Sequence, residues 1–549
     1  MAFLTRKTDK ILNRCPGWLT RHVTRAQSSP LASRLAGGAF WSLLGSVAFR
    51  GLQLLSIVFV ARILGAARFG ELGIIQTTVG MFSALAGFGL GMTATKHIAQ
   101  YRGVDAARAG RILAMSTLTA WITSTASGVF LFTLAPWLAR ATLGAPHLSG
   151  PIRASALLLM LTAVNGAQMG ELTGLEAFRA IAKVNVYSGI VSFLALLIGT
   201  YYGGLVGAVW ALVVGAAISC FLGLLFTRKE CRSAGIPVRL RGCWAERRIL
   251  WSFTLPAVLS GLMTGPANWA ATAMLVNQPN GYAAMGIYSA VLRFKQIPEA
   301  VLTLLLTPLL PVLSEQFGRR AVDQYHRTLH YAFGLSLVVV VPVSLVQIAA
   351  PRLTLAAFGE QFQSSGVVVQ WLMAQATLVG LFQPFSSILP SVGRMWFSCL
   401  YSAGYVIMFL LGSCLLVPRY GASGLAAAMT ITHATISLPC VAYLRLFERQ
   451  FLAGIWLFPS IALVGVFVFI GVFLSRTFST PLATITGCVL ATLPTLLALE
   501  HFRAMVRPTT GKPGLVAAQR ERGGVSSEVH LASPQRAEES TRFIAAVED

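Results

Sequence analysis

Fourteen stretches of this 549-residue chain are long and apolar enough to cross a lipid bilayer. A helix suits such a stretch because it satisfies its own backbone hydrogen bonds, which the bilayer core requires. The sequence therefore predicts an all-α polytopic membrane protein with about 14 transmembrane helices. The predicted spans are residues 38–61, 71–95, 112–135, 154–175, 181–201, 205–227, 249–274, 284–313, 330–350, 366–392, 397–417, 421–444, 452–475 and 482–502.

The distribution of positive charge predicts the topology. The chain is 55% hydrophobic and 11% charged, which excludes an ordinary soluble enzyme. Its net charge of +24, taken alone, would suggest that the protein binds nucleic acid. With the N-terminus inside, however, 33 of the 43 Lys and Arg residues fall in cytoplasmic segments and 7 in external loops. This is the positive-inside pattern, so we expect both termini in the cytoplasm, membrane lipids as partners and no nucleic acid.

The predicted eighth span carries charges that are unusual inside a membrane. Lys295 and Glu299 are four residues apart, so they share a helix face and can neutralise each other. Arg293 points nearly the opposite way, with Gln296 beside it. An unpaired charge at this depth is expensive and indicates a functional site with a partner. For Arg293 that partner is expected to be an anion.

The first predicted span repeats the same spacing with Arg50 and Gln53. Two hypotheses stay open for Arg50. It either pairs with a buried acid such as Glu299 and holds two helices together, or it lines a wet cavity and binds an anionic substrate. Acids are scarce inside the spans, where only Glu171, Glu176 and Glu299 occur, and this scarcity favours the anion site.

An internal repeat relates the first six spans to the next six. The stretch 202–219 resembles the stretch 420–437, where an offset of 217 places Gly204 on Gly421, and residues 69–77 resemble residues 282–290 at an offset of 213. Six spans per copy is an even number, so both copies begin on the same side of the membrane and an axis along the membrane normal relates them.

The repeat and the charge pattern together predict the domain organisation. The expected parts are a basic cytoplasmic N-terminal segment (1–37), an N-lobe (38–227), a basic cytoplasmic linker (228–248), a C-lobe (249–445), two extra C-terminal helices (446–504) and a disordered cytoplasmic tail (505–549). The linker is expected to lie along anionic lipid head groups.

Three segments carry a resemblance to a known family. They are ARILGAARFGELG (61–73), GELTGLEAFRAIAKVNV (170–186) and GIYSAVLRFKQIPEAVLTLLLTPLLPVLSEQFG (286–318). In their order and spacing, over residues 36–450, the chain resembles the polysaccharide and oligosaccharide flippases of the multidrug/oligosaccharidyl-lipid/polysaccharide exporter superfamily. The resemblance implies two pseudo-symmetric six-helix lobes around a central cavity. It also implies alternating access that carries an undecaprenyl-diphosphate-linked glycan across the bacterial inner membrane for surface polysaccharide synthesis (O-antigen, capsule or exopolysaccharide).

The resemblance also implies a substrate site. The related lipid II flippases use arginines of the first and eighth spans against pyrophosphate, and Arg50 and Arg293 occupy these spans. With Gln53 and Gln296 they are expected to bind the diphosphate, because guanidinium grips phosphate oxygens bidentately. The process needs no catalytic residue, metal or cofactor. Its expected partners are the lipid-linked glycan and, in the same pathway, a polysaccharide polymerase and export machinery. Lys295 and Glu299 form either a structural pair or titratable coupling groups.

Three other classes of membrane protein fit the sequence less well. A multidrug/cation antiporter of the same superfamily would share the architecture but would be expected to place carboxylates in the cavity. A membrane enzyme would need a larger external loop than 136–153, the longest predicted here. A non-transporting component of a polysaccharide assembly complex would not explain buried unpaired arginines.

Overall fold

The computed structural model describes most of the chain up to residue 447. The described residues are 30–87, 89–238, 242–246, 255–306, 309, 312–313, 316, 322–363, 365–391, 395–447 and 472. The chain divides into two compact units, Met1–Leu499 and Glu500–Asp549, and every described residue belongs to the first. Residues 1–29, predicted spans thirteen and fourteen apart from residue 472, and the predicted tail lie outside the described residues.

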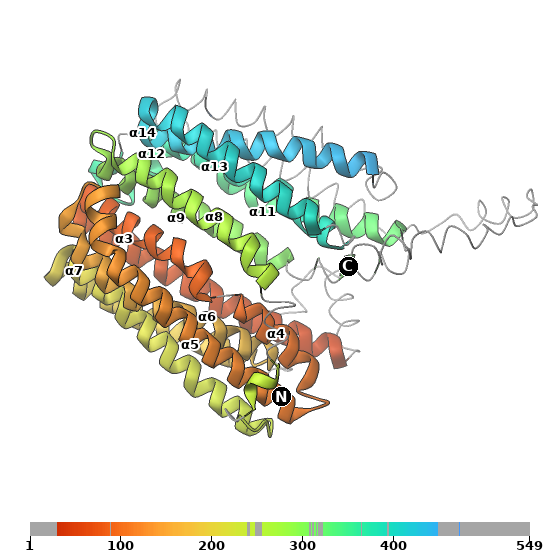
Figure 1. Ribbon diagram of the computed structural model, residues 1–549. Helices are drawn as coiled ribbons and strands as arrows, with labels where there is room; N and C mark the ends of the chain where they lie inside the picture. Colours follow the sequence, from red (N-terminus) through yellow and green to blue (C-terminus); the bar gives the residue numbers. More distant parts are fainter. Residues whose placement is uncertain are drawn as a thin grey trace, which may run out of the picture. The chain divides into compact units, whose positions relative to one another are not determined.

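Across the described residues the fold is helical, and no strand is formed (Figure 1). The α-helices are α3 (Pro30–Gly87), α4 (Leu90–Tyr101), α5 (Ala106–Trp137), α6 (Ser149–Gly174), α7 (Phe178–Ser233), α8 (Leu255–Val276), α9 (Gly281–Leu306), α11 (Val322–Ala349), α12 (Pro351–Ala356), α13 (Gly366–Ser391) and α14 (Met395–Phe447). Short 3-10 or π turns are η1 (Leu138–Thr142), η2 (Pro146–Leu148), η3 (Cys243–Glu246) and η5 (Glu360–Phe362).

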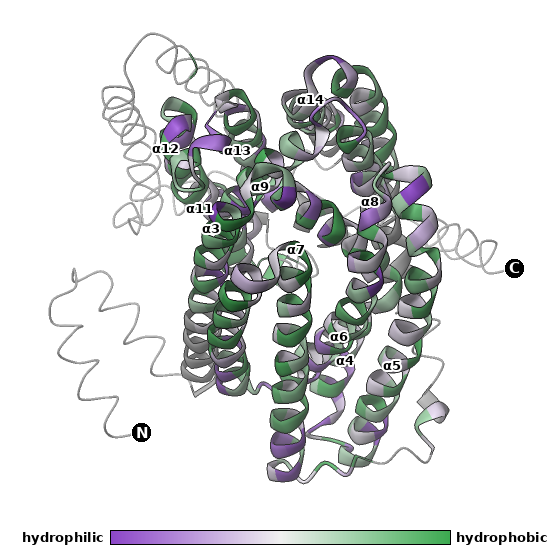
Figure 2. Ribbon diagram, turned by 90° about the vertical axis from the view of Figure 1, so that its left-hand side faces the viewer, coloured by the Kyte–Doolittle hydropathy of each residue, from purple (hydrophilic) through white to green (hydrophobic). Residues whose placement is uncertain are grey.

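The long helices match the predicted membrane class. Within the described residues, seven helical segments are long and apolar enough to cross a membrane. The segment Phe178–Ser233 has 56 residues, which is enough for two spans of about 20 residues each. Figure 2 shows hydrophobic colouring along most of α5 and α7. The fold class is therefore confirmed as all-helical with long apolar helices, while the count of fourteen spans stays a prediction.

Three of these long helices are interrupted at a single glycine. The backbone of α7 leaves helical geometry at Gly204 (φ 53°, ψ −132°), and that of α14 does so at Gly421 (φ 55°, ψ −130°). The two angles agree because the residues are equivalent in the sequence repeat at the offset of 217. Only glycine adopts this backbone without strain. A third break, at Gly65 in α3 (φ 72°, ψ 172°), lies between predicted spans one and two.

One predicted span is not continuous. We expected residues 71–95 to form a single helix, but α3 ends at Gly87 and α4 begins at Leu90. Gly89 has a left-handed backbone (φ 58°), which a continuous helix cannot contain. Hydropathy does not detect such a break because the apolar character continues across it.

Part of the predicted linker packs on α5. Its expected placement along lipid head groups stays a prediction. Helix α7 continues to Ser233, so the linker begins as helix. Ile236 is 5% exposed and Cys243 is 1% exposed, and both pack against apolar residues of α5. Lys229 and Arg232 stay exposed and available to lipid head groups.

Helix α3 contacts both the helices that precede the linker and those that follow it. It packs on α6 and α7, and also on α8 and α9. The crossing with α9 is close: a Cβ on Gly70 would overlap the carbonyl oxygen of Tyr282, and one on Gly286 would overlap that of Ala66. Small residues permit such an approach between membrane helices. This crossing holds the start of α9 against the half of α3 that follows Gly65.

Candidate functional site

The two Arg-x-x-Gln pairs predicted from the sequence meet at one small cavity. Arg50 and Gln53 reach it from α3, and Arg293 and Gln296 reach it from α9. Three apolar residues complete the lining, namely Leu54, Ile57 and Ile297. Each pair shares a helix face because three residues make almost one turn. The structure thus brings all four predicted binding residues together, although it does not test their role.

A second cavity adjoins the first and adds two polar residues that the sequence did not single out. It shares Gln53 and Arg293 with the first cavity and is also lined by Gln76 and Ser289. Gln76 lies in the half of α3 that follows Gly65. The sequence did contain a weak signal, because Gln76 is an isolated amide within an apolar span.

Gln76 is the direct partner of Arg293. The Nη2 group of Arg293 donates a hydrogen bond to Oε1 of Gln76, across 217 residues of sequence. An amide oxygen accepts this bond but carries no net charge. Within the described part of the chain Arg293 forms no ion pair, so its positive charge is positioned there but not neutralised, and its other N–H groups can bind an anion.

The structure contradicts the hypothesis that Arg50 pairs with Glu299. Nζ of Lys295 lies 3.1 Å from Oε1 of Glu299, so that carboxylate already has a partner four residues away. In the described part of the chain Arg50 forms no ion pair, and its side chain is exposed at the cavity. Arg50 lines the small cavity, and its role in binding an anion stays a prediction.

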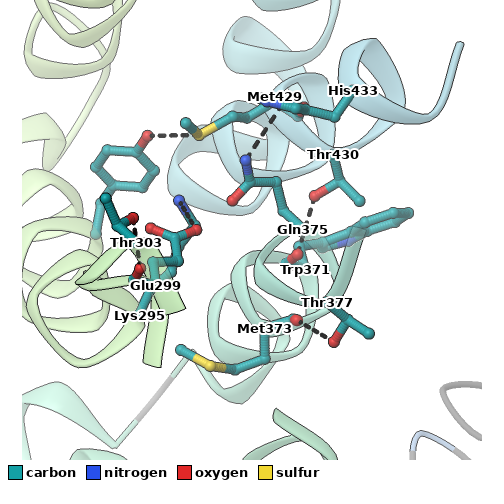
Figure 3. A network of polar contacts seen from close by, with 11 residues as sticks. Lys295, Glu299, Thr303, Trp371, Met373, Gln375, Thr377, Met429, Thr430 and His433 are labelled. Carbon is teal, nitrogen blue, oxygen red and sulfur yellow. Dashed lines mark hydrogen bonds and ion pairs between the residues drawn. The ribbon is translucent and has the colours of Figure 1, made fainter. Parts of the chain in front are cut away.

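The Lys295–Glu299 pair lies apart from the arginine cavity, as helical geometry predicted. Figure 3 shows the pair on α9 facing Gln375 of α13 and His433 of α14. Lys295 is only 5% exposed. The amide of Gln375 lies 3.2 Å from Nδ1 of His433, which is also 3.1 Å from the carbonyl oxygen of Met429. The pair therefore belongs to a buried polar cluster between α9, α13 and α14.

Three hydrogen bonds near the Gly65 break join segments from before and after the linker. The Nε group of Arg62 donates to the carbonyl oxygen of Ala357 at 2.8 Å, and the backbone N–H of Ala66 donates to Oε1 of Gln361 at 3.2 Å. The hydroxyl of Tyr282 donates to the carbonyl oxygen of Leu143 at 2.8 Å. These contacts tie the neighbourhood of Gly65 to the second half of the described chain and to the end of α5.

This arrangement of side chains can bind an anion without catalysing a reaction of that anion. Two guanidinium groups and three amides converge, and none of the described lining residues of the two cavities is a carboxylate. Planar guanidinium groups match phosphate oxygens bidentately, and amides add neutral hydrogen bonds. Among the described residues no group of three or more His, Cys, Asp or Glu side chains is placed to hold a metal ion.

The fold is similar to that of solved membrane transporters. The lipid II flippase MurJ, in an inward closed conformation, matches with a TM-score of 0.61 at 14% identity over 85% of this chain and 100% of the other. A multidrug resistance MATE family transporter of the MOP superfamily, in its inward-facing conformation, matches with a TM-score of 0.60 at 15% identity over 75% of this chain and 99% of the other. At these identities the likeness shows the fold alone, which is similar to that of both proteins.

Sequence comparison identifies the family. The model of the family described as "Polysaccharide biosynthesis protein" matches residues 35–317, just over half of the chain, and the chain belongs to this family. The succinoglycan biosynthesis transport protein ExoT of Rhizobium meliloti (strain 1021) is 27% identical over 368 residues, covering 64% of this chain and 67% of ExoT. The EPS I polysaccharide export inner membrane protein EpsE of Ralstonia nicotianae is 23% identical over 318 residues, covering 56% of this chain and 70% of EpsE. These two relatives are thus named as a transport protein and as an export protein of polysaccharide synthesis.

Proposed function

We propose that this protein is a flippase that moves undecaprenyl-diphosphate-linked oligosaccharide or polysaccharide repeat units across the bacterial inner membrane by alternating access. The observation that carries the proposal is the convergence of Arg50 and Arg293 on one cavity with amides and without a carboxylate among its described lining residues. A diphosphate has at least two negative charges, and two guanidinium groups match it in charge and in geometry.

The family membership supports the glycan part of the proposal. Relatives are named for succinoglycan biosynthesis transport and for EPS I polysaccharide export at the inner membrane. We accordingly place this protein in the inner membrane, with both termini in the cytoplasm, as the excess of cytoplasmic Lys and Arg predicts. A polysaccharide polymerase and export machinery are the expected partners in the pathway.

The proposed architecture has fourteen spans, of which twelve form two six-helix lobes related by the sequence repeat. The matching breaks at Gly204 and Gly421 support this pseudo-symmetry. In the proposed topology the Gly65 break lies at the external face, so the contacts of Arg62 and Tyr282 close the external end. Closing one end and opening the other would carry the head group across while the prenyl chain stays in lipid.

The proposal separates this chain from a multidrug/cation antiporter, although both share the fold. A cation site needs a carboxylate or another acceptor of positive charge, and the lining of the two described cavities instead contains two arginines. A non-transporting component of an assembly complex would not require these arginines at all. The arginine cavity therefore favours the flippase over both alternatives.

The proposal is tested in a strain that lacks the chromosomal gene and carries either the wild-type gene or a variant. We expect Arg293→Ala and Arg50→Ala to be inserted normally but to accumulate lipid-linked glycan on the cytoplasmic leaflet, with loss of surface polysaccharide. Mass spectrometry of the accumulated lipid identifies the glycan. Arg419→Ala is the matched control, because Arg419 is exposed and lies outside the cavity lining.

Two results would contradict the proposal. Full surface polysaccharide in the double variant Arg50→Ala/Arg293→Ala would show that neither arginine is needed. Absence of any lipid-linked glycan in the deletion strain, together with greater sensitivity to cationic dyes, would identify an antiporter instead. Immunoblotting of membrane fractions separates a transport defect from a failure to insert.

A further inference from the structure

A large apolar groove lies outside the arginine cavity, on the surfaces of α5, α6 and α7. Its volume is about 670 Å³. Most of its lining is apolar, and Val129, Phe132 and Trp210 are each about half exposed. On helices that cross a membrane, an exposed apolar groove faces lipid chains.

The helix register fixes how the groove runs. Near one end, the guanidinium carbon of Arg153 lies 5.3 Å from the ring centre of Phe132. Further along the same pair of helices, the hydroxyl of Thr125 lies 3.6 Å from the sulfur of Met160. Seven residues separate these contacts on each helix, which is about 10 Å. The groove therefore extends over about two-thirds of one leaflet of a bilayer with a 30 Å core.

Among the described residues that line the groove, the one charged side chain is that of Arg153, and it is positive. Within the described residues Arg153 forms no ion pair, and it is held over the face of Phe132 instead of by a carboxylate. A cation–π contact leaves the guanidinium N–H groups available. The N-terminus of α6 is close by in sequence, has no side-chain cap, and contributes Gly150 to the lining. A helix N-terminus favours anions, so both features select negative charge at this end of the groove.

The same end of the groove lies at a membrane–water interface. Trp137 at the end of α5 and Tyr201 and Tyr202 before the Gly204 break are exposed, at 56%, 72% and 83%. Exposed Trp and Tyr residues are typical of the interfacial zone of membrane proteins. In the proposed topology this is the external face, so the groove opens into the external leaflet.

We infer that the groove binds an anionic glycerophospholipid of the external leaflet, with an acyl chain along α5, α6 and α7 and the phosphate on Arg153. An acyl chain ends within one leaflet, as the groove does. A polyprenyl chain is several times longer and would extend far beyond it, so the transported lipid is not the expected occupant. The inference does not depend on what the protein transports.

The test compares variants in nanodiscs that contain equal amounts of phosphatidylglycerol and phosphatidylethanolamine. After extraction into detergent, native mass spectrometry counts the lipids that remain bound. We expect the full-length wild-type protein to retain phosphatidylglycerol preferentially, and Arg153→Gln to lower that preference about fivefold. Arg140→Gln is the matched control, because Arg140 is also exposed near this end but does not line the groove.

Trp210 gives a second measurement that does not rely on charge. Acyl chains brominated near the head group should quench part of the tryptophan fluorescence of the wild type, and Trp210→Phe should remove that part. Equal lipid preference in Arg153→Gln and wild type would overturn the inference, as would retention of a polyprenyl phosphate in place of phosphatidylglycerol. A melting curve for each variant shows whether it is folded, and a folded variant with unchanged preference counts against the site.

Discussion

The sharpest prediction concerns the unequal contributions of the two cavity arginines to diphosphate binding. Arg293 is half-buried and fixed by Gln76, so its bonds to phosphate form in a site of low dielectric constant. Replacing it with Gln should cost about 2–3 kcal/mol of binding free energy. That loss raises Kd about 30- to 150-fold. Arg50 is exposed, and water screens its charge. Arg50→Gln should therefore cost about 1 kcal/mol, or about fivefold in Kd.

Isothermal titration of the purified protein with a soluble short-chain prenyl diphosphate measures both values, and the corresponding prenyl alcohol controls for binding through the chain. Arg293→Lys keeps the charge but loses the planar fork, so its Kd should lie between those of wild type and Arg293→Gln. An unchanged Kd in Arg293→Gln would refute the role of this residue, and equal affinity for the alcohol would refute recognition of the diphosphate.

Two further predictions concern the surrounding helices. Replacing only Lys295 by Met leaves a largely buried carboxylate on Glu299 without its partner and should destabilise the protein by about 3 kcal/mol. The double variant Lys295→Met/Glu299→Met should restore both the abundance of the protein in the membrane and its transport activity. If abundance recovers but transport does not, the pair would instead be titratable groups that couple transport to its energy source. Gly286→Val should force α9 away from the carbonyl oxygen of Ala66 and cost about 1–3 kcal/mol of folding free energy. It should also open the proposed closure at the external end, near Gly65. A cysteine introduced by Ala66→Cys should then react faster with an impermeant thiol reagent added outside, and an unchanged rate would count against this closure.

Several features were predictable because they depend on local helix geometry. The side-by-side placement of Lys295 and Glu299 follows from a spacing of four residues, and the ion pair is observed at 3.1 Å. The separation of Arg293 from that pair also follows from helical periodicity, as does its placement beside Gln296. The repeat predicted equivalent positions for Gly204 and Gly421, whose backbones agree within a few degrees.

Other features could not be predicted, because they depend on how distant helices pack. Gln76 binds Arg293 across 217 residues, and periodicity within either helix gives no information about that contact. The break at Gly89 interrupts an apolar stretch whose hydropathy is continuous, so composition could not reveal it. The burial of Ile236 and Cys243 against α5 likewise depends on the path of the linker, not on its charge.

The sequence by itself determined that this protein is a polytopic helical membrane protein, because long apolar stretches can satisfy their backbone only as helices in lipid. It also determined which face of each helix carries its charges, because the helical period is fixed. Only the tertiary structure decided that the faces of Arg50 and Arg293 meet, and that Arg153 stands at the end of an apolar groove. The physical reason is that two side chains from distant helices meet only where those helices pack closely together. Here α3 and α9 pack closely where Gly70 contacts Gly286. Such packing does not follow from the pattern of residues within either helix.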